Sequence, residues 1–109
     1  MWRGGSTLDK SRLLDLETAQ NRRIDIVSAI LDSIKQVKTL DKGFGLRFSP
    51  DDADLLLVCD WIYVERICNP FLRFTLKSES NRGPIWVEVT GPEGTQSLLK
   101  SEFALGRWL

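Results

Sequence analysis

Three aspartates within four residues, Asp51, Asp52 and Asp54, form the densest group of side chains in this chain that could perform chemistry. Carboxylate oxygens are the ligands that Mg²⁺ and Ca²⁺ prefer. The spacing and the distal glutamate of an EF-hand calcium loop are absent, however, and Ser49-Pro50-Asp51 is also a pattern that begins a helix or a turn. We therefore expect these aspartates to cap or solvate a turn, and we predict no metal site.

Other patterns that support catalysis are missing. The 109 residues include no histidine, which excludes Ser-His-Asp and Cys-His catalysis, histidine metal ligands and a histidine pH switch. Gly43-Phe44-Gly45 lacks the further glycine and the Lys-Ser/Thr pair of a phosphate-binding loop. We expect no enzymatic activity and no cofactor.

The two cysteines, Cys59 and Cys68, are nine residues apart, which matches no metal-binding or redox motif. In an extended segment this odd separation would place the thiols on opposite faces, so we predict two free, buried thiols. Reduced thiols, together with the lack of a signal peptide and of an apolar stretch of about 18 residues, predict a cytoplasmic protein that does not enter a membrane.

A second group combines basic and aromatic side chains that could bind nucleic acid on one face of a sheet. Aromatic rings stack on bases, and basic groups hold phosphates. The residues of this possible nucleic-acid face are Arg47, Phe71, Arg73, Lys77 and Trp86. The charge argues against this partner, because 15 basic residues balance 15 acidic ones and the chain from residue 44 onward has more acidic than basic residues. Nucleic acid is therefore the less expected partner.

The length and the apolar fraction of 42% predict one globular domain over residues 1–109. Residues 1–6 are expected to form a flexible leader. A helix is predicted over residues 7–40, because residues 8–40 contain neither proline nor glycine and their apolar residues recur with a period near 3.6. Two helices broken near Asn21, within a polar stretch, are the alternative.

The rest of the chain predicts an antiparallel sheet over residues 44–90 and a short helix over residues 95–106. Residues 50–67 are ambiguous, because a helix-start pattern precedes a run that is apolar on every side and rich in β-branched and aromatic residues. We predict a turn at residues 50–54 and a strand over about 55–67. The fold class is α+β, with a long N-terminal helix packed on a four-stranded antiparallel meander and a short C-terminal helix.

The predicted N-terminal helix is longer than the domain that it packs on. A helix over residues 8–40 would span ~48 Å, whereas a domain of this size has a diameter of ~34 Å. Its first half would project beyond the sheet and expose an apolar surface for a protein partner, either a second copy or another subunit. The residues of this partner interface are Leu8, Leu13, Leu14, Leu16 and Trp2.

We therefore expect a non-enzymatic protein–protein interaction or assembly module, which works as a homodimer or as a small subunit of a larger complex. The alternative is a nucleic-acid-binding module that uses the aromatic and basic face of the sheet.

Overall fold

The computed structural model describes residues 14–108. Along the chain it contains helix α2 (Leu16–Ser33), strands β1 (Gln36–Leu40) and β2 (Gly43–Phe48), helix α3 (Asp52–Cys68), strands β3 (Arg73–Ser78) and β4 (Ile85–Thr90), helix α4 (Thr95–Phe103) and a 3₁₀ turn, η2 (Leu105–Trp108). The sheet is antiparallel throughout, with the strand order β1-β2-β4-β3. The α+β class, the N-terminal helix, the four-stranded antiparallel sheet and the short C-terminal helix are thus confirmed.

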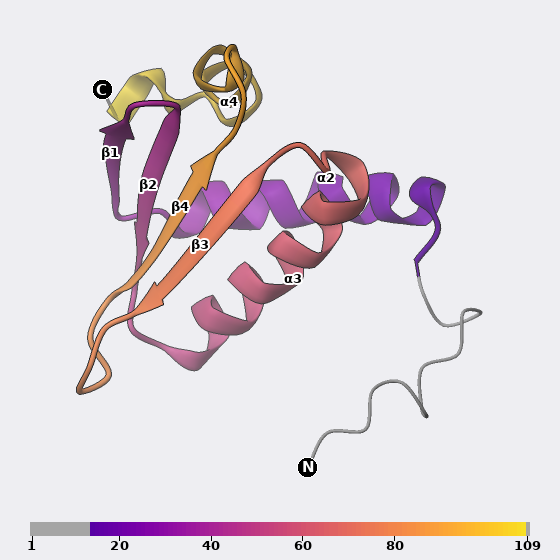
Figure 1. Ribbon diagram of the computed structural model, residues 1–109. Coiled ribbons are helices and arrows are strands. Elements are labelled where there is room, and N and C mark those ends of the chain that lie inside the picture. Colours follow the sequence, from indigo (N-terminus) through magenta and orange to yellow (C-terminus); the bar gives the residue numbers. More distant parts are fainter. Residues whose placement is uncertain (1–13, 109) are drawn as a thin grey trace.

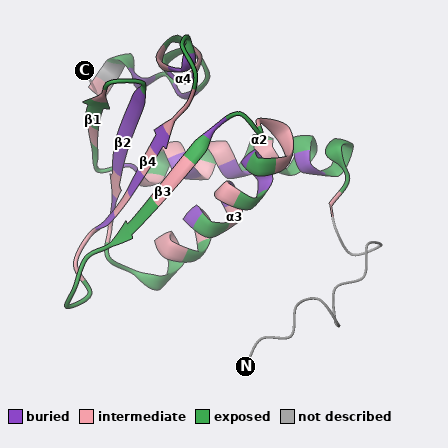
Figure 2. Cartoon of the chain, in the orientation of Figure 1, coloured by how far each residue is buried: buried purple, intermediate pink, exposed green. Residues whose placement is uncertain are grey.

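The molecule has two layers (Figure 1). Helices α2 and α3 cross behind one face of the sheet, and α4 lies at the end of the sheet near the β1–β2 turn. No helix of the described part of the chain covers the opposite face, which we call the open face. Alternation along β2 and β4 turns the apolar side chains toward the helices, where they are buried (Figure 2). These are Phe44, Leu46, Phe48, Ile85, Val87 and Val89.

Trp61 of α3 lies at the centre of the core and is fully buried. Its ring meets Phe74 of β3 edge-on at a centroid distance of 5.2 Å and Phe103 of α4 at 5.6 Å. Edge-to-face geometry is the favoured arrangement of aromatic pairs. One side chain therefore joins the second long helix, an edge strand and the closing helix.

Residues 52–68 form helix α3, so the predicted strand over residues 55–67 is wrong. Asp51 caps this helix, and its carboxylate accepts a hydrogen bond of 2.7 Å from the backbone N–H of Asp54. The helix-start signal therefore outweighs the β propensity of the residues that follow. Apolar residues occur all round α3 because it is packed on more than one side, yet Leu56 and Tyr63 remain exposed.

Helix α2 has 18 residues, so the predicted helix over residues 7–40 is too long. It begins after the N-cap Asp15 and is ~27 Å long. It also runs without a break through Asn21, which excludes the two-helix alternative. Its expected last turns instead form β1, whose Val37 and Thr39 pair with Leu46 and Phe44 of β2. The β-branched residues of this segment suit a strand better than a helix.

The strand order also differs from the expected meander. Helix α3 connects β2 to β3, and strands β3 and β4 form the second hairpin of the sheet. In this hairpin β4, rather than β3, pairs with β2. Helix α4 ends at Phe103, three residues before the predicted end, because Ala104 adopts a left-handed conformation with φ of 47°. None of the helices in residues 14–108 has the length and apolarity required to span a membrane.

Candidate functional site

The side chains on the open face form three rows, each crossing the four strands in the order β1, β2, β4, β3. Residues opposite each other in antiparallel strands share a face, so the pairing register fixes the rows. They are Gln36, Arg47, Trp86 and Lys77 in the first row, Lys38, Gly45, Glu88 and Thr75 in the second, and Leu40, Gly43, Thr90 and Arg73 in the third.

All charged side chains of the four strands lie on this open face. Four are basic, namely Lys38, Arg47, Arg73 and Lys77, and one, Glu88, is acidic. Lys77 pairs with Glu88 at 3.1 Å. The described residues contain no carboxylate in an ion pair with any of the other three cations. The face therefore carries an excess of positive charge that the protein itself leaves largely unneutralised.

Trp86 lies in the first row of the open face, between two cations. Arg47 and Lys77 flank it on the two neighbouring strands, and the Lys38 ammonium lies 5.5 Å from the centroid of its ring, a cation–π contact. Gly45 lies beside the indole, and a Cβ atom there would make an ordinary van der Waals contact of 3.7 Å with Cε3 and Cζ3 of Trp86.

The helical layer has the opposite charge. Counted with their N-cap residues, α2 and α3 carry three basic side chains, Arg22, Arg23 and Arg66, against nine acidic ones. The acidic residues are Asp15, Glu17, Asp25, Asp32, Asp51, Asp52, Asp54, Asp60 and Glu65. The strands and the helices thus carry charges of opposite sign, other residues of the chain bring the net charge to zero, and the net charge describes neither surface.

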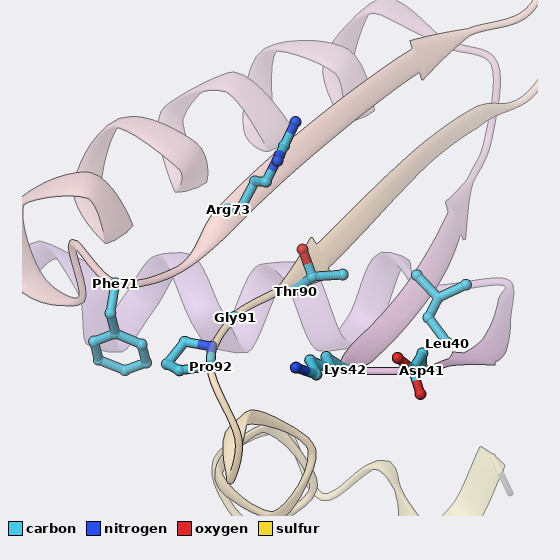
Figure 3. A pocket seen from close by; sticks show the side chains of 8 residues that line it. All are labelled: Leu40, Asp41, Lys42, Phe71, Arg73, Thr90, Gly91 and Pro92. Atoms are coloured by element: carbon cyan, nitrogen blue, oxygen red, sulfur yellow. The ribbon is translucent and has the colours of Figure 1, made fainter.

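A shallow pocket of about 530 Å³ lies at the end of the open face where β1 turns into β2 (Figure 3). The ring of Phe71 and the ring of Pro92 lie beside each other on one side, and the Lys42 side chain points toward them. Thr90 and Leu40 contribute to the lining from β4 and β1. The pocket therefore combines an apolar wall with two cations, Lys42 and Arg73, the hydroxyl of Thr90 and one carboxylate, that of Asp41.

The fold brings all five residues of the predicted nucleic-acid face to this side of the molecule. Arg47, Arg73, Lys77 and Trp86 project from the strands, and Phe71 lies just before β3 with 47% of its surface exposed. The sequence prediction did not include Lys38, because residues 36–40 were assigned to a helix. The alternation of Val37 and Thr39 with polar neighbours was the signal that could have found it.

A separate group of charged side chains is buried between the helices. Glu65 is fully buried, and its carboxylate receives hydrogen bonds from Arg23 at 2.6 and 3.1 Å, from Trp61 Nε1 at 3.1 Å and from Asn69 Nδ2 at 2.9 Å. Arg23 also binds Glu102 of α4. The hydrogen bonds with Glu65 raise the pKa of Arg23 above its already high range. This network links α2, α3 and α4 and leaves no open position for a ligand.

The aspartates Asp51, Asp52 and Asp54 lie at the N-terminal end of α3. Asp51 is the N-cap, Asp54 accepts a hydrogen bond from the backbone N–H of Ser49 at 3.2 Å, and Asp52 lies 3.4 Å from Arg82. Within residues 14–108, no three histidine, cysteine or acidic side chains gather closely enough to hold a metal ion.

The predicted partner interface lies partly outside the described residues, which do not include Trp2, Leu8 and Leu13. Leu14 is half-buried, and its backbone N–H lies 3.4 Å from the Tyr63 hydroxyl as a hydrogen-bond donor. Leu16, in the first turn of α2, is 52% exposed. The 48 Å helix that motivated this interface is wrong, because α2 has 18 residues and begins after its N-cap Asp15.

The cysteines are both free, as predicted, but only one is shielded. Cys59 is exposed on α3, since a helix turns it away from the sheet. Cys68 is half-buried, and burial, followed by the negative charge of Glu65, raises the pKa of its thiol. The expectation of two buried thiols is therefore wrong for Cys59.

Comparison with known proteins does not extend this description, because no protein-family model, curated protein or solved structure matches the chain.

Proposed function

We propose that this domain is a non-enzymatic nucleic-acid-binding module that uses the open face of its sheet. One observation carries the proposal: all four cations of the strands lie on the uncovered face, three of them (Lys38, Arg47 and Lys77) around Trp86, while nine acidic side chains lie on α2 and α3 or at their N-caps. The overall charge was the argument against this function, and it loses its force once the two layers are separated.

The arrangement suits a polyanion physically. Arg47 and Lys77 lie on the strands directly beside that of Trp86, and neighbouring strands are ~4.8 Å apart. Cations at this spacing can contact phosphates on both sides of a base that stacks on the ring. Each phosphate neutralised releases counterions, so binding of this kind weakens steeply as salt rises.

The proposal is tested by reversing two charges on the open face and, as a control, two charges elsewhere on the surface. The first variant carries Arg47→Glu and Arg73→Glu, and the matched control carries Arg66→Glu and Lys100→Glu, which change the net charge equally from exposed positions on α3 and α4. We expect the first variant to bind a fluorescent single-stranded oligonucleotide about tenfold or more weakly at low salt, and the control to bind within a factor of about three of the parent. Equal losses in both variants, or no binding by the parent, would refute the proposal.

A second candidate is association with a protein partner at one end of the helix pair. The observation that favours it is the exposure of Leu16 and Tyr63, which accompany the half-buried Leu14 where α2 begins. Exposed apolar groups of this kind are stabilised by contact with another chain. If this surface joins two copies, Leu16→Asp will reduce the mass measured by light scattering. A parent that is monomeric and binds no protein there contradicts this candidate.

A further inference from the structure

Resting on the proposed function, we infer that the ligand is a single strand of about four nucleotides, held between two aromatic positions at opposite ends of the open face. Trp86 is the first position, and the pocket beside Phe71 is the second.

At the first position, the Trp86 indole lies on the open face beside Gly45. Gly45 has no side chain beside the indole, and Lys38, Arg47 and Lys77 supply cations around it. Every base has an aromatic face, so a stacking ring surrounded by cations binds single strands with little sequence preference. Bases stacked inside a duplex cannot reach such a ring, and this favours an unpaired strand.

The second position offers the same chemistry in a different form. Phe71 and Pro92 provide an apolar wall for a base, and Lys42 lies next to them as a partner for a phosphate (Figure 3). The Thr90 hydroxyl adds a hydrogen-bonding group at the rim. Arg73 lies on β3 opposite Thr90, and its side chain extends from the pocket along the strand toward the Lys77 end of the face. The path between the two aromatic positions therefore passes the Arg73 side chain and Glu88, whose carboxylate pairs with Lys77 at 3.1 Å.

The distance between the two positions sets the length of the site. Trp86 and Thr90 are four residues apart on β4 and point to the same face, which corresponds to ~13 Å at ~3.3 Å per residue. Stacked nucleotides rise ~3.4 Å each along a strand. About four nucleotides therefore cover the path from the indole to the pocket.

Aromatic substitutions test this inference separately from the charge. Binding of oligo-dT of two, four and eight nucleotides, and of a blunt duplex, is measured for the parent and for Trp86→Leu and Phe71→Leu. Trp86→Phe keeps a ring, and Tyr63→Leu removes an exposed aromatic from the helical layer as the matched control. Thermal unfolding verifies that each variant is folded.

We expect affinity to rise steeply from two to four nucleotides and only weakly from four to eight. Trp86→Leu and Phe71→Leu should each weaken single-strand binding about 5- to 100-fold, whereas Trp86→Phe retains most of it and Tyr63→Leu has no effect. Duplex binding should be weaker than single-strand binding in the parent and unchanged by the aromatic substitutions.

The outcomes separate the two proposals. Single-strand binding that responds to Arg47→Glu and Arg73→Glu but to neither aromatic substitution overturns this inference and leaves the proposed function intact. Equal affinity for the duplex and for the single strand likewise overturns this inference and leaves the proposed function intact. Absence of binding to any oligonucleotide, or equal binding of a poly-glutamate peptide, overturns the proposed function and the inference with it.

Discussion

The buried Glu65 network and the open face of the sheet both contain charged side chains, but only those of the network are buried and fully hydrogen-bonded within the protein. Glu65 is removed from water, and four hydrogen bonds from three residues satisfy its carboxylate. Lys38, Arg47 and Arg73 remain at the surface without an acidic partner among the described residues. The first group is complete within the protein, whereas the second has charge left for a ligand.

Pairing and burial, rather than charge itself, distinguish the ions of the buried network from the cations of the open face. A buried charge without its partner costs several kcal/mol, so it must be satisfied for the protein to fold. An exposed cation is hydrated and contributes little to folding. Substitutions in the two regions should therefore affect different measurements.

The largest effect is expected from breaking the buried network. Arg23→Ala leaves Glu65 buried without its cation and should lower the free energy of unfolding by about 3–5 kcal/mol. Arg22→Ala is the matched control, because the neighbouring arginine pairs with Asp60 at 2.9 Å at the surface and should contribute no more than about 1 kcal/mol. Chemical denaturation measures both. Similar losses for the two arginines would show that the buried network has no special role.

The thiols of Cys59 and Cys68 provide a second comparison, between an exposed group and a half-buried one. Cys59 is exposed, whereas burial and Glu65 raise the pKa of Cys68 and so lower its reactive thiolate fraction. We expect a bulky thiol reagent to modify Cys59 about tenfold faster than Cys68 in the native protein. Reaction is followed for Cys59→Ser and Cys68→Ser separately. A faster reaction at Cys68 would contradict the placement of α3.

Neutralising one cation of the open face should change binding and leave stability nearly constant. Arg47→Gln removes a positive charge from the open face. In the parent, Arg47 Nε donates a hydrogen bond to Gln36 Oε1 at 3.0 Å. We expect a change in unfolding free energy within about 0.5 kcal/mol and a decrease of about 0.7 in the steepness of the salt dependence of single-strand binding. A large loss of stability would place Arg47 with the structural charges instead.

The smallest effect concerns an exposed charge that has a structural role. The Thr18 backbone N–H donates to the Asp15 carboxylate at 2.8 Å and lowers its pKa below the ordinary value of 3.8. A lowered pKa in the folded state means that the stabilisation is present above pH 3.8 and is lost as the pH falls through the folded-state pKa. Asp15→Ala should therefore lower Tm slightly at neutral pH. A difference from the parent that persists unchanged at pH 2 would contradict this assignment.

The sequence predicted the fold class, because the apolar alternation of β2, β3 and β4 is a local signal. It did not predict α3, since Leu55–Val64 is apolar on every side and its periodicity is uninformative. It also did not predict β1, whose strand conformation depends on pairing with β2. Secondary structure that is fixed by distant partners cannot be derived from a local pattern.

Five residues of the candidate site were predicted from the sequence, whereas Lys38, the pocket residues Lys42, Thr90 and Pro92, and the charge of the face were not. Arg47, Phe71, Arg73, Lys77 and Trp86 were identified from strand alternation, and the structure places them on one side of the molecule. The segregation of charge between the layers depends on which face each helix and strand presents. That information comes from topology and is absent from a count along the chain.

The most direct test is the salt dependence of single-strand binding by the intact chain. If Lys38, Arg47 and Arg73 contact phosphates, the logarithm of the association constant will fall with the logarithm of salt concentration with a slope of about −2, at about −0.7 for each phosphate. The variant Arg47→Glu/Arg73→Glu will have a much shallower slope. A parent slope near zero, or the same slope in parent and variant, would contradict a binding role for the open face.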